Sequence, residues 1–298
     1  MSNDSSLPPY GRRPEGYRLP AEAHPGAVRL AVSDLERSLD YYQRVLGFEV
    51  RERTPGVARL GTTGGGPSLI ELHEEPGARS VARSPRLGLY HFAILMPDRA
   101  SLGRFLAHLG QIGQYAGMSD HLVSEALYLR DPDGLGIEVY ADRPRSTWAH
   151  HDGELAMAAD PLDVENLVRA GGDEPWTGMP TGTRVGHMHL HVGDLERAAA
   201  FYHNALGFDL MAWSYPGALF FGAGGYHHHL GTNTWATGAT SASEGDARLL
   251  EWELLFPSDA AVREALSSVE SAGYPVQRTD DGGTVRDPWG TWLRLRSV

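Results

Sequence analysis

Apolar and polar residues alternate along the chain with two different periods, and these periods follow each other in a repeated order. Val28–Val32 (VRLAV) has an apolar side chain at every second position, which predicts a β-strand. In Leu35–Leu46 apolar residues recur every three or four positions, which predicts an amphipathic helix. Asp34 stands at the N-cap position and Gly47 follows the last apolar residue, as expected for the two ends of a helix.

The strand–helix order recurs because the chain contains an internal duplication. Val32–Phe48 (VSDLERSLDYYQRVLGF) and Val192–Phe208 (VGDLERAAAFYHNALGF) match position by position at an offset of 160 residues. The same offset relates Pro97–Leu106 to Pro257–Leu266. Three further strand-like stretches follow each helix, separated by glycine-rich or DPDG-type turns. We therefore predict an α+β fold of four βαβββ modules, at residues 26–76, 88–141, 185–235 and 249–297.

The segment between the second and third modules has a different composition. Residues 142–184 are rich in proline, glycine and charge and contain one short helix candidate, PLDVENLVRAG, so we predict an interdomain linker. The resulting division has an N-terminal arm at 1–25, expected to be poorly ordered, a first domain of modules one and two at 26–141, and a second domain of modules three and four at 185–298.

Composition excludes several classes of function. The net charge of −12 argues against a nucleic-acid partner, because such proteins need a positive surface. The absence of cysteine excludes zinc–thiolate sites and thiol nucleophiles, and since all 26 Lys+Arg residues are arginine, Schiff-base chemistry is excluded too. No apolar run approaches the roughly 18 residues of a membrane span. The first residues lack a secretory signal, so we expect a cytoplasmic protein without a membrane partner.

Four paired βαβββ modules resemble the vicinal oxygen chelate superfamily, which includes glyoxalases, extradiol dioxygenases and drug-binding resistance proteins. The segments DLERSLDYYQRVLGF and DLERAAAFYHNALGF resemble its first-helix signature, and the resemblance covers nearly all of the chain after residue 25. It implies two open, curled mixed sheets, each built from two modules. It also implies a metal on a concave face, bound by side chains from the first and last strands of the modules.

The resemblance assigns one candidate ligand position to the first strand of each module. These positions hold, in chain order, Ala27, His91, His187 and Glu251. In the last strand, module two offers Glu138, whereas module four has Arg294, which cannot bind a cation. Modules one and four are therefore each incomplete.

Module three carries three consecutive histidines in GGYHHHLGTNTW, the region of its last strand. Packing alone explains this run poorly, because imidazole is a mediocre core residue. In a regular strand, His227 and His229 point to one face and His228 to the other. Similarity to the glyoxalase pattern, with Asn233 as a marker, favours His229 as the ligand.

The segment SDHLVSEALYLRDPDGLGIE in module two closely resembles the fingerprint of extradiol ring-cleaving dioxygenases. The resemblance implies that Glu138 binds the metal, that His121 acts as an acid or base, and that Tyr128 hydrogen-bonds the substrate. The residues alone leave another interpretation open, in which DPDG is only a tight hairpin turn and Glu138 is a carboxylate at a strand end.

The set of ligands depends on which modules share a sheet. If modules three and four pair, the set is His187, His229 and Glu251, although Glu251 could equally be an outward charge on its strand. If modules two and three pair, as resemblance to hydroquinone ring-cleaving dioxygenases suggests, His91, Glu138 and His187 meet on one concave face. His229 then lies nearby. We favour this second arrangement, which predicts one metal site and not two.

Two imidazoles and a carboxylate with open positions opposite suit non-haem Fe(II). Together with the resemblance, they predict an extradiol, catechol 2,3-type dioxygenase that joins dioxygen to a catechol or hydroquinone-like diol. One alternative is a glyoxalase-type isomerase or lyase, with four ligands around Mn(II), Ni(II) or Zn(II). Another is a drug-binding resistance protein that needs no metal. The sequence leaves a monomer and a homo-oligomer both open.

Overall fold

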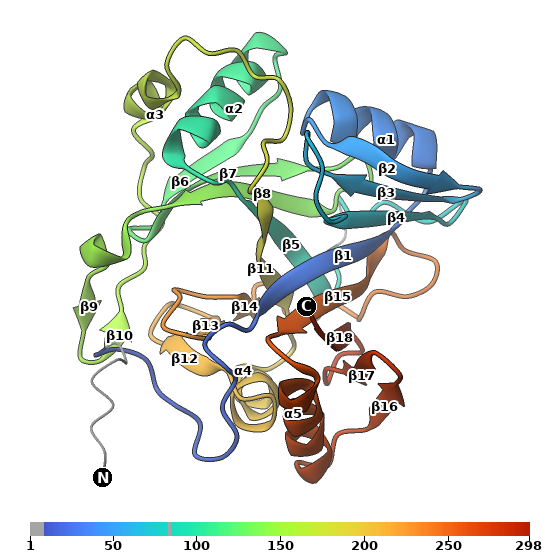
Figure 1. Cartoon of the computed structure of the whole chain (residues 1–298), viewed down its shortest axis with the longest axis vertical. Coiled ribbons are helices and arrows are strands. Elements are labelled where there is room, and N and C mark those ends of the chain that lie inside the picture. Colours follow the sequence, from blue (N-terminus) through green and yellow to red (C-terminus); the bar gives the residue numbers. More distant parts are fainter. Residues whose placement is uncertain (1–8, 83–84) are drawn as a thin grey trace.

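The computed structural model describes residues 9–82 and 85–298, which form two eight-stranded mixed sheets with helices packed against them (Figure 1). The predicted α+β class and the order of elements within the modules are confirmed, since each module is a strand, a helix and three further strands. No helix in these two ranges is long and apolar enough to cross a membrane.

The module boundaries agree with the predicted ones. Module one contains β1 (His24–Val32), α1 (Leu35–Arg44), β2 (Glu49–Thr54), β3 (Val57–Gly61) and β4 (Ile70–Glu74). Module two contains β5 (Gly88–Leu95), α2 (Arg99–Gln111), β6 (Gly117–Asp120), β7 (Ser124–Arg130) and β8 (Gly136–Asp142). Module three contains β11 (Arg184–His191), α4 (Leu195–Ala198) continued by the π-helical turn η2 (Ala199–Ala205), β12 (Asp209–Ala212), β13 (Ala218–Gly222) and β14 (Leu230–Asn233). Module four contains β15 (Arg248–Phe256), α5 (Asp259–Ser271), β16 (Val276–Thr279), β17 (Gly282–Arg286) and β18 (Trp292–Ser297).

Each sheet combines one module from each half of the chain. One sheet, called here the 2/3 sheet, has the order β12-β13-β14-β11-β5-β8-β7-β6, and the 1/4 sheet has the order β16-β17-β18-β15-β1-β4-β3-β2. Antiparallel pairing of β5 with β11, and of β1 with β15, joins the modules at the centre of each sheet. The favoured pairing of modules two and three is confirmed, and the pairing of three with four is wrong. The sequential division at 26–141 and 185–298 therefore does not coincide with the sheets.

The segment 142–184 has structure of its own. It contains a 3₁₀ turn, η1 (Arg145–Thr147), a short hairpin of β9 (His150–His151) and β10 (Glu154–Leu155), and α3 (Val164–Gly171), the helix that the sequence predicted. The helices α3 and α2 approach backbone to backbone, because a Cβ on Gly103 would lie 2.2 Å from the carbonyl oxygen of Leu167.

The N-terminal arm is more ordered than predicted. Residues 1–8 lie outside the described residues, but the remainder of the arm is attached to module three. Arg12 forms a backbone bridge with Leu210, and the N–H of Leu19 donates to the carbonyl of Gly207. The guanidinium of Arg18 pairs with Asp209 at 2.5 Å.

The helix ends follow the sequence signals. The side chains of Asp34 and Asp194 each accept a hydrogen bond from the N–H three residues on, which satisfies a backbone donor at the helix start. Gly47 and Gly207 adopt positive φ values of 78° and 95° at the helix ends, a conformation that favours glycine.

The DP turns of modules two and four link the two sheets. Asp131 in DPDG accepts a hydrogen bond from the buried hydroxyl of Tyr42 in α1, 3.4 Å away. Asp287 in DPWG accepts the equivalent bond from Tyr202 at 2.9 Å. Each bond joins a helix of one sheet to a turn of the other. The DPDG turn therefore has a structural role in addition to leading into Glu138.

Burial of Asp131 predicts a loss of stability with rising pH. Burial raises the pKa of this carboxyl from 3.8 to about 7, so the folded chain keeps a proton that the unfolded chain releases. Stability should therefore fall as pH rises through that interval, by about 2–3 kcal/mol between pH 5 and pH 8. The isosteric change Asp131→Asn should flatten this dependence in urea unfolding curves. Parallel pH profiles for the two proteins would contradict the assignment.

Candidate metal centre

Three buried side chains converge at the centre of the 2/3 sheet. His91 comes from β5, Glu138 from β8 and His187 from β11. Oε2 of Glu138 lies 2.9 Å from Nε2 of His91 and 3.2 Å from Nε2 of His187, and the two Nε2 atoms are 3.4 Å apart. Among residues 9–82 and 85–298, these three side chains form the group whose donor atoms lie close enough together to bind one metal ion.

Strand register brings these side chains together. Ala93 lies opposite His187 on β11 and opposite Glu138 on β8, so all three project from the same face, as does His91 two residues before Ala93. The methyl group of Ala93 leaves room above the strand for the longer side chains. Gly136 lets β8 run close to β5, because a Cβ there would lie 2.0 Å from the carbonyl oxygen of Tyr90.

The spacing of the three donor atoms fits a bound divalent cation. Two ligand atoms held at about 2.1 Å from a metal and at right angles to each other are about 3.0 Å apart. The observed separations of 2.9, 3.2 and 3.4 Å match three mutually adjacent positions, which leaves the opposite side of the ion open.

The protonation states also suit a cation. Burial raises the pKa of Glu138, but the neighbouring imidazoles outweigh this effect and hold the pKa well below its usual range. Burial lowers the pKa values of His91 and His187, and Glu138 opposes this only in part. An ionised carboxylate and neutral imidazoles are the forms that bind metals.

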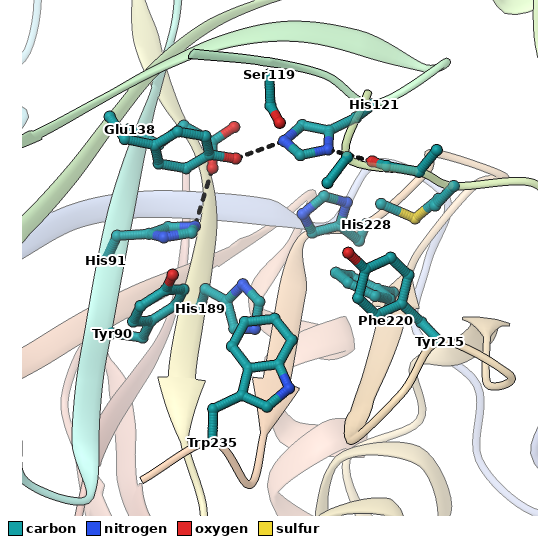
Figure 2. A pocket seen from close by; sticks show the side chains of 14 residues that line it. Tyr90, His91, Ser119, His121, Glu138, His189, Tyr215, Phe220, His228 and Trp235 are labelled. Carbon is teal, nitrogen blue, oxygen red and sulfur yellow. Dashed lines mark hydrogen bonds and ion pairs between the residues drawn. The ribbon is translucent and has the colours of Figure 1, made fainter. Parts of the chain in front are cut away.

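A cavity of about 230 Å³ opens beside these ligands (Figure 2). Its walls are mostly aromatic and imidazole rings, with Met157 and Ala158 contributed by the segment 142–184. Figure 2 shows His121 and His228 on the side of the cavity facing His91. The sequence pattern had not singled out three aromatic members of this wall, Tyr90, Tyr215 and Trp235.

The two residues predicted to be catalytic form one hydrogen-bonded pair at the cavity. Nδ1 of His121 lies 2.5 Å from the carbonyl oxygen of Ala158, so Nδ1 carries the proton and donates it. Nε2 of His121 then accepts from the hydroxyl of Tyr128, 2.5 Å away. Burial raises the pKa of Tyr128 well above its usual value, which keeps this hydroxyl protonated. Tyr128 stands directly opposite Glu138 on the neighbouring strand.

The structure corrects the placement of His229. The three histidines precede β14 in an irregular segment, so strand alternation does not govern their directions. Nδ1 of His229 accepts a hydrogen bond from the N–H of Ala223, and its ring stacks on Tyr226, away from the ligand group. His228 lines the cavity instead, with its ring centroid 4.1 Å from that of His187. Of the three consecutive histidines, the structure thus places His228 at the cavity, whereas the sequence favoured His229.

No fourth ligand stands where the module symmetry would place one. His189 on β11 corresponds to Ala93 on β5, and β14 presents Gly231 opposite it, as β8 presents Glu138 opposite Ala93. Gly231 has no side chain, and a Cβ there would lie 3.0 Å from the ring of His189. The symmetry therefore yields three ligands and not four.

The 1/4 sheet holds an arginine at the corresponding place. Arg29 pairs in register with Glu71 and Glu251, as Ala93 does with Glu138 and His187. Nη1 of Arg29 lies 2.8 Å from Glu251, and its Nε lies 3.4 Å from Glu71. A guanidinium thus occupies the space between the two carboxylates. Glu251 forms an ion pair within the 1/4 sheet, so it does not belong to the ligand group of the 2/3 sheet.

The fold and the site define the class of protein. The sequence model of the Glyoxalase/Bleomycin resistance protein/Dioxygenase superfamily matches residues 24–139 and 184–295, which is most of the chain. The chain belongs to this superfamily.

Its relatives narrow the comparison. The chain is 44% identical over 271 residues to the catechol-2,3-dioxygenase of Bacillus subtilis (strain 168), covering 90% of this chain and 94% of that protein. It is 28% identical over 146 residues to the lactoylglutathione lyase of Pseudomonas putida, which covers 39% of this chain and 83% of that protein.

Solved structures share the fold at low sequence identity. A Bacillus subtilis protein superposes with a TM-score of 0.62 at 15% identity, covering 94% of this chain and 86% of that one. Glyoxalase I from Zea mays gives 0.53 at 19% identity, covering 93% of this chain and 92% of that one. Identities this low indicate a shared fold and nothing about the reaction.

Proposed function

We propose that this chain is a metal-dependent extradiol ring-cleaving dioxygenase that acts on a single-ring aromatic diol and dioxygen. The observation that carries the proposal is the set His91, Glu138 and His187, whose open side faces a cavity lined by further imidazoles and a tyrosine. The 44% identity to a catechol-2,3-dioxygenase over most of both chains supports the same reaction.

Fe(II) is the metal that we propose for this site. Two imidazoles and one carboxylate on one side of the ion, with open positions opposite, are characteristic of non-haem Fe(II) oxygenases. When bound, iron would supply the redox chemistry that lets a diol react with dioxygen. Mn(II) is a second candidate for the same donors. Zn(II) and Ni(II) can also bind two imidazoles and a carboxylate, but zinc has no redox chemistry with which to use dioxygen.

Two observations favour this function over the alternatives. A glyoxalase-type isomerase requires a fourth side-chain ligand, but Gly231 stands at the matching position and His229 lies elsewhere. A drug-binding resistance protein needs no metal, whereas His91, Glu138 and His187 have the spacing of metal ligands.

A chain of hydrogen bonds prepares His228 to act as a base. Nε2 of His227 lies 2.9 Å from Oδ1 of Asp142, and Nδ1 of His227 lies 2.7 Å from Nδ1 of His228. When the carboxylate of Asp142 accepts the Nε2–H of His227, the unprotonated Nδ1 of His227 can accept the Nδ1–H of His228. Nε2 of His228 is then left with a lone pair. Burial, with the neighbouring imidazoles, holds the pKa of His228 well below its usual value, so the ring is neutral and free to accept a proton from a diol hydroxyl.

The pair His121 and Tyr128 supplies the complementary function. The Tyr128 hydroxyl donates to His121, so its oxygen lone pairs remain available to a hydroxyl of the bound diol. Tyr128 can pass a proton from a diol hydroxyl to Nε2 of His121, and the imidazolium so formed can return it through Tyr128 to the product as the ring opens. We therefore propose His121 as an acid or base and Tyr128 as a substrate-binding hydroxyl, with His228 as a further base.

Oxygen uptake tests the proposed function directly. Protein purified without a histidine tag and reconstituted anaerobically with Fe(II) should consume one dioxygen per catechol and yield a yellow ring-opened semialdehyde. Reconstitution with Zn(II) should give no uptake, because zinc has no redox chemistry. Stoichiometric iron binding without uptake on any catechol or hydroquinone would instead support an isomerase.

A further inference from the structure

A second cavity lies directly beside the candidate metal centre. Its volume is about 340 Å³, and Tyr90, His91 and Tyr128 line both this cavity and the first one. Figure 2 shows Tyr90 next to His91 at the edge of the first cavity. The two cavities therefore adjoin each other at these three side chains, one of which is a candidate metal ligand.

Arg130 lines the second cavity on the same face of the sheet as the metal ligands. It is the last residue of β7 and follows Tyr128 by two positions, so both side chains leave the same face, about 7 Å apart along the strand. The residue opposite Arg130 on β8 is Gly136. Because Gly136 has no side chain, the backbone of Tyr90 on β5 approaches it closely, and Tyr90 lines the same cavity as Arg130.

The charge of Arg130 is not balanced within the described ranges. No carboxylate there lies within 4.0 Å of its guanidinium, and Nη1 donates to the backbone carbonyl of Gly134 at 2.9 Å. Two other arginines in an adjoining small cavity are paired, Arg86 with Asp246 and Arg248 with Glu75. Arg130 is exposed and lines the cavity, so its guanidinium is accessible to an anionic ligand there.

We propose that the second cavity binds a carboxylate-bearing substituent of the aromatic diol, with Arg130 as its partner. The inference rests on the proposed function and narrows its substrate class to catechols with an acidic side chain. A guanidinium can hold a carboxylate with two parallel hydrogen bonds. Tyr90, which lines both cavities, carries a hydroxyl that can add a third. Catechol itself would react but would leave this subsite empty.

The test compares two diols that differ only in charge. We would measure kcat/KM for 3,4-dihydroxyphenylacetate and for its uncharged amide with iron-loaded wild-type protein and with Arg130→Gln. The wild type should prefer the acid. In the variant, the preference for acid over amide should be about 10- to 100-fold smaller than in the wild type, as expected for losing a hydrogen bond to a charged group. Arg44→Gln, on the exposed surface of α1, should keep the wild-type preference.

A binding measurement separates this inference from the proposed reaction. Phenylacetate lacks the diol, so its binding in a calorimeter does not depend on ring cleavage. Binding to the wild type that weakens at least tenfold in Arg130→Gln would support the subsite even if no diol were cleaved. An equal preference for acid and amide, or phenylacetate binding that is absent or unaffected by the variant, would overturn it.

Discussion

Glu138→Ala should leave a folded protein that no longer retains its metal. Glu138 supplies the one negative charge among the three candidate ligands, and its loss leaves two neutral imidazoles facing the ion. Removing a residue that only hydrogen-bonds to a metal ligand lowers metal affinity by about 10–100-fold. Removing Glu138, which would be a ligand itself, should lower it by more. Metal content after dialysis measures this, and ring cleavage should drop to background.

Glu251→Ala is the matched control. Glu251 occupies the equivalent place in the 1/4 sheet, where it pairs with Arg29. Its removal should leave both metal content and activity at wild-type levels. If Glu251→Ala lost the metal while Glu138→Ala kept it, the proposed centre would be in the wrong sheet.

His228→Gln should lower kcat by about 100- to 10,000-fold, the usual contribution of a positioned acid or base. Glutamine preserves much of the size of the side chain, but it cannot accept a proton from the diol. Metal content and the far-ultraviolet circular dichroism spectrum should not change, since His228 is outside the ligand group.

The neighbouring histidine provides the comparison for this variant. His229→Gln keeps an acceptor for the N–H of Ala223 and lies away from the cavity, so kcat should stay at the wild-type value. Loss of metal in His229→Gln would restore the ligand role that the sequence suggested. A full rate in His228→Gln would leave His121 as the principal acid or base.

Local signals in the sequence predicted most of the fold. The N-caps at Asp34 and Asp194 and the glycines that end the same helices depend on residues a few positions apart, and the structure has all of them. The pairing of modules is a different matter. The first strands of all four modules have similar patterns, and the segment 142–184 is long enough to let module three pair with module two or with module four. Only long-range contacts therefore decide which modules share a sheet.

The candidate site was predictable where the strands were regular. His91, Glu138 and His187 lie on β5, β8 and β11, and alternation along these strands fixes the face from which they project. The same rule failed at His229 because the chain is irregular before β14. Met157 and Ala158 were not recognised as cavity residues, since nothing in their local pattern indicates that a connecting segment folds back over a sheet.

The exchange of modules between the halves also sets the order in which the protein can mature. His91 and Glu138 are synthesised well before His187, and the sheet that unites them cannot close until β11 has left the ribosome. An ion held by all three would join early and late parts of the nascent polypeptide. Metal capture would therefore be a late event in biogenesis, and a truncated product that ends within the connecting segment would never be able to acquire its cofactor.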